Sequence, residues 1–301
     1  MNALLVGAVD THVHSSPDVV PRRLDDRGVT AMAADAGLRA IVLKNHHGCT
    51  AARATLAQVV CDNVRVLGGL VLNNSACGGF NADAVRVSLK LGGKVVWMPT
   101  VSAANHIEYM RQHPDDRHVV SLGHGLQSEG LTPLRNKDTL GDDVLEILDL
   151  IAEADAVLAT GHLSALESCV MVTQAFRRGV SRVLITHPEA PQIAMPREIQ
   201  CDLAGQGAML ERCYYSLRAG YPAEEMLSEA RACGIESTVF ATDLGQVHNP
   251  LPTDGLLAFH NELASRGLTE DEWWRASAFN PSELLGLEKE STILRARDAI
   301  S

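Results

Sequence analysis

The sequence lacks any surplus of basic residues, since 26 Lys and Arg stand against 37 Asp and Glu and the formal net charge is −11. Nucleic acids and anionic membrane surfaces select basic faces, so neither is an expected partner. The first residues, "MNALLVGAVDTHVH", lack a basic region, and their apolar run is too short to span a membrane. We therefore expect a strand there in place of a signal peptide, and we expect a cytoplasmic protein.

Cysteine pairs at a metal-binding or redox spacing are also missing. The seven cysteines are scattered, odd in number and never form CxxC. This pattern favours reduced thiols over a disulfide framework or a structural zinc site. What is present is an ordinary globular composition, 46% hydrophobic and 21% charged over 301 residues. A chain of this length can bury one large core.

One local pattern recurs along the chain: an amphipathic helical stretch, a glycine and a short apolar run, as in "AADAGLRAIVLK" and "FRRGVSRVLITH". Glycine just past a helix tolerates the left-handed conformation that ends the helix. An apolar run without alternation is typical of a parallel strand that is covered on both faces. Such strands are expected at 4–9, 39–43, 64–71, 94–98, 156–160, 182–186, 208–213 and 236–241.

Eight strands that alternate with helices over roughly 250 residues predict an α/β fold, a (β/α)8 TIM-like barrel that forms a single domain over residues 1–301. A doubly wound open sheet is the alternative, but neither GxGxxG nor GxxxxGK[ST] follows the first strand. Residues 114–140 break the rhythm and predict a small β-hairpin inserted after the fourth strand, with "HVVSLG" and "GLTPL" flanking its turn. "LTEDEWWRASAFNPSELLGL" predicts closing helices.

In a barrel of this kind, function lies at the C-terminal ends of the strands. His12 and His14, in "VDTHVH", are two residues apart on the first strand, so both imidazoles lie on one face. His162, His187 and Asp243 end the fifth, sixth and eighth strands. A lone histidine at a strand end is more often an ordinary hydrogen-bonded residue. Nitrogen and carboxylate ligands from four strands together predict a site for zinc, manganese or iron.

These motifs resemble the amidohydrolase superfamily of metal-dependent hydrolases, and the resemblance covers residues 5–290. It implies that His12 and His14 hold the more buried metal, and that His162 and His187 are ligands of a second one. Asp243 matches the strand-eight carboxylate that binds metal and shuttles a proton. The branch of the superfamily to which the chain is similar is a poorly characterised one.

The fourth strand departs from the superfamily pattern. Binuclear members commonly place a carboxylated lysine or a glutamate there to bridge the metals, whereas this strand ends "KVVWMPT". Lys44, in "IVLKNHHG" at the end of the second strand, can supply the bridge if it is carboxylated, or act as a cation towards the substrate. A buried ammonium beside divalent cations must lose or pair its charge. The alternative is that Lys44 points outward or pairs with an acid.

A second resemblance concerns the first two strands. "DTHVHSSPD" followed by "KNHHG" is similar to motifs of the polymerase-and-histidinol-phosphatase (PHP) phosphoesterases, where Asn45 and His46 would replace an Asp-His pair. That family carries Asp-x-His on its last strand, and the sequence Asp243-Leu244-Gly245 lacks this histidine.

Further polar residues near the strand ends are candidates for substrate contact: His46, Arg22, Arg23, Asn73, His106, Glu211 and Tyr214. Arg22 and Arg23 can bind a carboxylate with their guanidinium groups, or be solvated charges beside nearby acids. Asn73 can contact substrate or only form a turn. Glu211 is expected in a buried position, where an unpaired carboxylate is costly, and is also a candidate partner of a ligand histidine.

The implied activity is hydrolysis of an amide, cyclic amide, lactone or ester bond in a small molecule by metal-activated water, with Asp243 as the proton shuttle and Lys44 beside it. With a single metal, His187 can serve as a base instead of a ligand. One or two divalent ions are expected, zinc first, then manganese or iron. The alternatives are a PHP-like phosphoesterase, a metal-dependent decarboxylase, and a metal-binding barrel without catalysis. A homodimer or higher homo-oligomer is compatible with the sequence.

Overall fold

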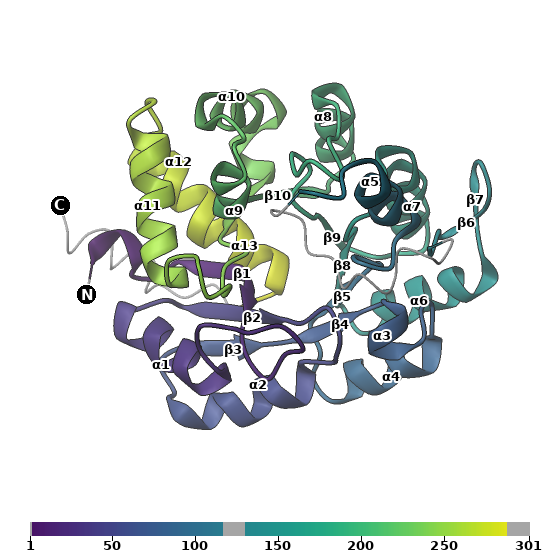
Figure 1. Ribbon diagram of the computed structural model, residues 1–301, viewed down its shortest axis with the longest axis horizontal. Coiled ribbons are helices and arrows are strands. Elements are labelled where there is room, and N and C mark those ends of the chain that lie inside the picture. Colours follow the sequence, from purple (N-terminus) through teal and green to yellow (C-terminus); the bar gives the residue numbers. More distant parts are fainter. Residues whose placement is uncertain (1, 117–129, 288–301) are drawn as a thin grey trace.

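Short parallel strands form the centre of the molecule, and helices surround them (Figure 1). The structure is a computed structural model, and it describes residues 2–116 and 130–287. The central strands, in chain order, are β1 (Val9–His14), β2 (Ala40–Lys44), β3 (Arg65–Leu67), β4 (Gly69–Val71), β5 (Val95–Trp97), β8 (Val157–Ala159), β9 (Arg182–Ile185), β10 (Met209–Cys213) and β11 (Thr238–Ala241).

These strands form an eight-stranded barrel, as predicted. They are ordered β1-β2-β3 and β11-β10-β9-β8-β5-β4. Only Gly68 separates β3 from β4, so the two count as one strand that pairs with β2 on one side and β5 on the other. At the other junction, the His14 amide donates to the Leu244 carbonyl at 2.8 Å, and the Asp243 amide donates to the His12 carbonyl at 2.9 Å.

The first strand starts later than predicted. Residues 4–9 were expected to be extended, but Ala3–Leu5 form a 3-10 helix and β1 begins at Val9. Between them Gly7 has a φ of 85°, a left-handed conformation that glycine adopts without strain. The apolar run "ALLVGAV" therefore belongs to two elements, and only its end enters the barrel.

The helices of the outer layer follow the strands in the order expected of a (β/α)8 barrel (Figure 1). They are α1 (Asp26–Ala36), α2 (Ala51–Ala57), α3 (Asn74–Cys77), α4 (Ala82–Lys90), α5 (Ala104–Gln112), α6 (Asp142–Glu153), α7 (Ala165–Arg177), α8 (Arg197–Gly205), α9 (Tyr214–Arg218), α10 (Ala223–Cys233), α11 (Pro252–Ala264), α12 (Glu270–Trp274) and α13 (Asn280–Leu285). The closing helices predicted from "LTEDEWW" onward are α12 and α13, joined by a π-helical turn.

The barrel interior is apolar from its N-terminal end up to the level of the strand ends. Along β2, Ala40 and Val42 belong to the interior cluster, and alternation brings Lys44 to the same side. Leu284 and Leu285 of α13 join this cluster from below, where α13 packs against β1, β9 and β11. Two larger apolar clusters fill the layer between strands and helices.

The insertion after the fourth strand contains a hairpin, but its strands differ from the predicted ones. β6 (Leu134–Asn136) pairs antiparallel with β7 (Thr139–Leu140), directly before α6. Leu131 contacts Ala103 in a parallel bridge instead of entering the hairpin. The predicted first strand, 118–123, lies outside the described residues, as do His118 and His124.

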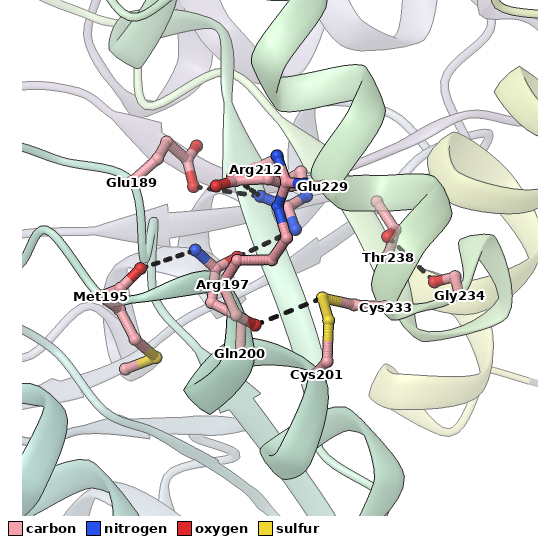
Figure 2. Close-up of a disulfide and its surroundings, with 10 residues drawn as sticks. All are labelled: Glu189, Met195, Arg197, Gln200, Cys201, Arg212, Glu229, Cys233, Gly234 and Thr238. Atoms are coloured by element: carbon pink, nitrogen blue, oxygen red, sulfur yellow. Dashed lines mark hydrogen bonds and ion pairs between the residues drawn. A yellow bond between two sulfur atoms is a disulfide. The ribbon is translucent and has the colours of Figure 1, made fainter.

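The expectation that all cysteines are reduced is wrong in this structure, because Cys201 of α8 and Cys233 of α10 form a disulfide (Figure 2). The two helices belong to neighbouring strand–helix units and lie side by side, which the sequence spacing does not reveal. The other five cysteines are free. Disulfides are rare in reducing compartments, so the cytoplasmic location expected from the sequence stays a prediction.

Beside the disulfide, a buried arginine joins the outer face of β10 to the same two helices (Figure 2). The Nη1 atom of Arg212 lies 3.2 Å from a carboxylate oxygen of Glu229, and its Nη2 donates to Gln200 at 3.0 Å. A carboxylate oxygen of Glu189 lies 3.6 Å from Nη1. Two carboxylates thus offset the charge of the buried guanidinium, although its Nε atom has no hydrogen-bond partner among the described residues.

Within residues 2–116 and 130–287, no helix has the length and apolar character needed to cross a membrane.

The disulfide predicts a measurable contribution to stability. A crosslink between residues 32 positions apart restricts the unfolded chain, and its removal costs about 3 to 4 kcal/mol in the loop-entropy model. The double variant Cys201→Ser/Cys233→Ser should lose about this much free energy of unfolding in urea titrations, while Cys61→Ser, which removes a free thiol, should not. Alkylation of the denatured wild type should modify five cysteines without reductant. Modification of all seven would contradict the disulfide.

Candidate metal centre

Three ligand atoms converge where β1 meets the segment after β11. The Nε2 atom of His12 lies 3.2 Å from Oδ1 of Asp243, and the Nε2 atom of His14 lies 3.1 Å from the same oxygen. All three atoms lie within 4.8 Å of one another. Asp243 reaches this place with a φ of 53°, a conformation that costs energy for a residue with a side chain and is typical of functional positions.

The tautomer of His12 is set by a carboxylate behind it. The Nδ1 atom of His12 lies 3.0 Å from Oε2 of Glu211, whose other oxygen accepts a hydrogen bond from the Thr11 hydroxyl at 2.7 Å. A carboxylate accepts, so Nδ1 carries the proton and Nε2 keeps a lone pair directed at Asp243. This arrangement of carboxylate, histidine and open lone pair is the one that orients metal ligands.

Lys44 lies inside the site and does not point outward. Its side chain is buried, with Nζ 3.0 Å from Nε2 of His12 and 5.6 Å from the centre of the Trp97 ring. Trp97 is the last residue of β5, the fourth strand of the barrel. Binuclear members of the superfamily commonly have their bridging residue on this strand, and this chain does not. Lys44 of β2 thus brings an amine close to the end of β5, the strand that carries no bridging residue.

Further histidine rings form a wall beside this cluster. The ring centres of His162 and His187 are 5.2 Å apart, that of His187 is 5.8 Å from His12, and that of His46 is 5.0 Å from His14. His162 and His187, predicted as ligands of a second metal, therefore line the same pocket without joining the three close ligand atoms.

Burial keeps the imidazoles of this wall neutral. Desolvation lowers the pKa of His12 and of His187 to about 3, and it holds the pKa of His14, His46 and His162 well below the usual range. Neutral imidazole is the form that binds a cation. Desolvation also lowers the pKa of Lys44 and raises that of Glu211 to about 7.

The donor set fits a divalent ion. Two neutral imidazoles and a carboxylate are ligands that zinc accepts, and the set leaves room for further ligands. Within the described part of the chain, the buried Nδ1 atoms of His14 and His187 have no hydrogen-bond partner. A bound ion, water or substrate can complete their bonding, since buried polar atoms are almost always paired.

The pocket over the cluster contains some of the predicted substrate residues and excludes others. Among its lining residues are Arg22, Lys44, His46, His162, His187, Gln192, Tyr215, Asp243 and Gln246. Arg23 is exposed instead, and its guanidinium donates to the Asn249 carbonyl at 2.6 Å. His106 lies behind the pocket, with Nδ1 2.9 Å from Nδ1 of His162.

Asn73, Tyr214 and Glu211 do not line the pocket that the structure describes. The Asn73 amide donates to the His46 carbonyl and to the Thr100 hydroxyl and accepts from the Thr100 amide, so it holds two loops together. Tyr214 is buried 5.9 Å from Phe259, ring centre to ring centre. Glu211 contacts His12 and does not reach the pocket space.

The sequence interpretation missed Tyr215, Gln192 and Gln246, which line the pocket. Tyr215 follows Tyr214 at the start of α9, and only the rotation of that short helix decides which of the two rings faces the site. Gln192 lies in the loop after β9, for which the sequence offered no local signal beyond its place at a strand end.

Solved structures that share this fold include hydrolases and a decarboxylase. An amidohydrolase from Pseudomonas aeruginosa matches with a TM-score of 0.63 and 11% identity, covering 94% of this chain and 96% of its own. A probable 2-pyrone-4,6-dicarboxylic acid hydrolase from Acinetobacter baumannii matches with a TM-score of 0.58 and 14% identity, over 94% and 100%. A 2,6-dihydroxybenzoate decarboxylase matches at 0.57 and 12%, over 94% and 100%.

At these identities the similarity establishes the fold alone, which is the fold that the resemblance to the amidohydrolase superfamily implies. The model of a family of unknown function, DUF6282, matches residues 7–211. This span runs from just before β1 into β10 and includes His12, His14, Lys44, His162 and Glu211. No curated protein matches the chain in sequence.

The contact between Glu211 and His12 predicts an effect on metal affinity. Glu211→Gln removes the charge that fixes the His12 tautomer, and loss of such a partner typically costs roughly 10-fold to 100-fold in affinity. Competition with a chromogenic chelator should show this loss for zinc. Glu229→Gln, which removes a buried carboxylate on the outer face of the barrel, should leave zinc affinity unchanged. Equal affinities for Glu211→Gln and wild type would contradict the assignment.

Proposed function

The chain belongs to the DUF6282 family of unknown function, and we propose that it is a metal-dependent hydrolase that cleaves an amide, cyclic amide, lactone or ester bond in a small molecule. The convergence of His12, His14 and Asp243 at the C-terminal end of the barrel carries the proposal. The buried carboxylate of Glu211 behind His12 supports it, because a histidine without a ligand role has no need of this orientation.

His12, His14 and Asp243 would hold the first ion, and His162 and His187 are available to a second. A divalent ion, zinc by our proposal, lowers the pKa of a coordinated water towards 7 and polarises the bond under attack. The residues of the chain do the rest: they orient the reactants, exclude bulk water and move protons.

Asp243 is the proposed proton carrier. Its side chain is 16% exposed, whereas those of His12 and His14 are 0% and 2% exposed, so it is the part of the cluster that a reactant can reach. Its carboxylate accepts the proton of the attacking water and gives it to the leaving nitrogen or oxygen. The positive φ of Asp243 and the hydrogen bond from its backbone amide to the His12 carbonyl keep this carboxylate in place.

Lys44 has two proposed roles, depending on its chemical state. Burial disfavours its ammonium form, and a neutral amine adds to carbon dioxide, losing one proton to give an anionic carbamate. The carbamate would add anionic oxygen ligands beside His12, where Lys44 Nζ lies 3.0 Å from Nε2. If Lys44 stays unmodified, it is a cation that stabilises negative charge developing on the substrate.

The phosphoesterase alternative loses support at the last strand. The PHP pattern requires a histidine two residues after the aspartate, and this chain has Gly245 there. A Cβ atom at Gly245 would lie 1.9 Å from the His14 carbonyl oxygen, so the backbone of β1 leaves no space for any side chain. The difference from the PHP pattern is thus built into the packing of the barrel.

Turnover by the zinc-loaded protein on a panel of lactones, amides, esters and phosphomonoesters tests the proposal. We expect hydrolysis in the first three classes and a loss of roughly 100-fold or more in kcat for Asp243→Asn, the usual effect of removing a general acid–base group. Asp83→Asn, on the exposed surface of α4, is the matched control. Tight zinc binding without turnover of any substrate would favour the barrel without catalysis.

A further inference from the structure

One of the side chains that line the pocket is a buried guanidinium. Arg22 lies on the segment between β1 and α1, and its side chain is 1% exposed although it lines the pocket. An antiparallel bridge between Arg22 and Gln246 ties this segment to the loop after β11. The arginine is therefore fixed by backbone contacts at the same strand ends that carry His14 and Asp243.

The carboxylate of Asp18 positions the guanidinium of Arg22 but does not pair all of its nitrogen atoms. The Nε atom of Arg22 donates to Oδ2 of Asp18 at 2.7 Å, and the Asp18 side chain is fully buried. The second oxygen of Asp18 accepts from the Val19 amide at 2.6 Å. Asp18 thus holds one edge of the guanidinium, while the Nη2 atom is buried without a hydrogen-bond partner among the described residues.

A buried donor without a partner costs free energy, and almost all buried donors in proteins have a hydrogen-bond partner. A planar guanidinium with an unpaired Nη2 is suited to an oxyanion, because the guanidinium geometry matches a carboxylate. Gln192 and Tyr215 line the same pocket, and Oε1 of Gln192 is a second buried atom without a partner in the described part of the chain.

We propose that Arg22, held by Asp18, forms a carboxylate subsite in the pocket, so that the molecule bound there is a small organic acid. A carboxylate is favoured over a phosphate because Asp18 already offsets much of the Arg22 charge, which leaves the site little positive charge to hold a dianion. That this acid is the substrate rests on the proposed hydrolase function. Its carboxylate would lie at Arg22 and its scissile bond at the cluster of His12, His14 and Asp243.

Calorimetric titration of the zinc-loaded protein with glutarate, glutaramide and inorganic phosphate tests the subsite. Wild type should bind glutarate at least about tenfold more tightly than glutaramide or phosphate. Arg22→Gln should lose at least tenfold in glutarate affinity and leave glutaramide affinity unchanged. Arg23→Gln is the matched control, because this neighbouring arginine is exposed and outside the pocket, and its glutarate affinity should equal that of wild type.

Arg22→Gln leaves Asp18 buried without its cation, so the variant can lose stability for that reason alone. The double variant Asp18→Asn/Arg22→Gln removes both charges and should fold with the same loss of glutarate affinity. Wild type that does not bind glutarate at millimolar concentrations, a double variant that binds it as wild type does, or phosphate binding more tightly than glutarate would each overturn the proposal.

The experiment separates this proposal from the hydrolase proposal, because it measures binding and not turnover. Arg22-dependent glutarate binding in a protein that hydrolyses nothing would keep the subsite and remove the hydrolase. Hydrolysis of neutral lactones that Arg22→Gln leaves unchanged, together with weak glutarate binding, would keep the hydrolase and overturn the subsite.

Discussion

The junction of β1 with the end of β11 is the constraint on which the rest of this molecule depends. The same few residues close the barrel and form the candidate metal site: the His12 carbonyl accepts from the Asp243 amide, while the His12 imidazole lies 3.2 Å from the Asp243 carboxylate. Below them, the Asp10 carboxylate accepts from the Thr242 amide and hydroxyl at 3.0 and 2.6 Å. If the barrel opened at this junction, His12 and His14 would separate from Asp243, and the candidate metal site would be lost.

This arrangement has an energetic cost that explains its other features. Five imidazoles and the Lys44 amine are buried around one pocket, with the Glu211 carboxylate buried behind His12, and burial disfavours the charged form of each. The imidazoles respond by staying neutral, which is the state that ligation requires. Three apolar clusters stabilise the fold and offset the cost of burying this polar layer. One fills the barrel interior below the site and includes Leu284 and Leu285, and the other two lie between the strands and the helices.

Much of the fold follows from sequence because its signals are local. Short apolar runs located seven of the eight strands closely, five of them after a helix and a glycine, and alternation placed His12 and His14 on one face. The first strand was misplaced because Gly7 breaks an apolar run that looks continuous. The Cys201–Cys233 disulfide was missed because it joins two helices that only the closed barrel brings together.

The site was predictable to the level of the strand ends and no further. Asp243, Lys44 and the histidines follow from their places after apolar runs, but side-chain direction in the loops does not. Arg22 and Arg23 are neighbours in sequence, and only the bridge to Gln246 decides that the first faces the pocket and the second faces solvent. The same holds for Tyr214 and Tyr215 at the first turn of α9.

The most direct test of the account is the metal content per chain, measured by elemental mass spectrometry on wild type and on the double variant His12→Ala/His14→Ala after loading with zinc and removal of the excess. We predict at least one zinc ion per wild-type chain and a loss of at least one in the variant, with both proteins folded by circular dichroism. An absence of bound metal in the wild type, or equal content in the two proteins, would contradict the central claim that β1 and β11 meet to hold a divalent ion.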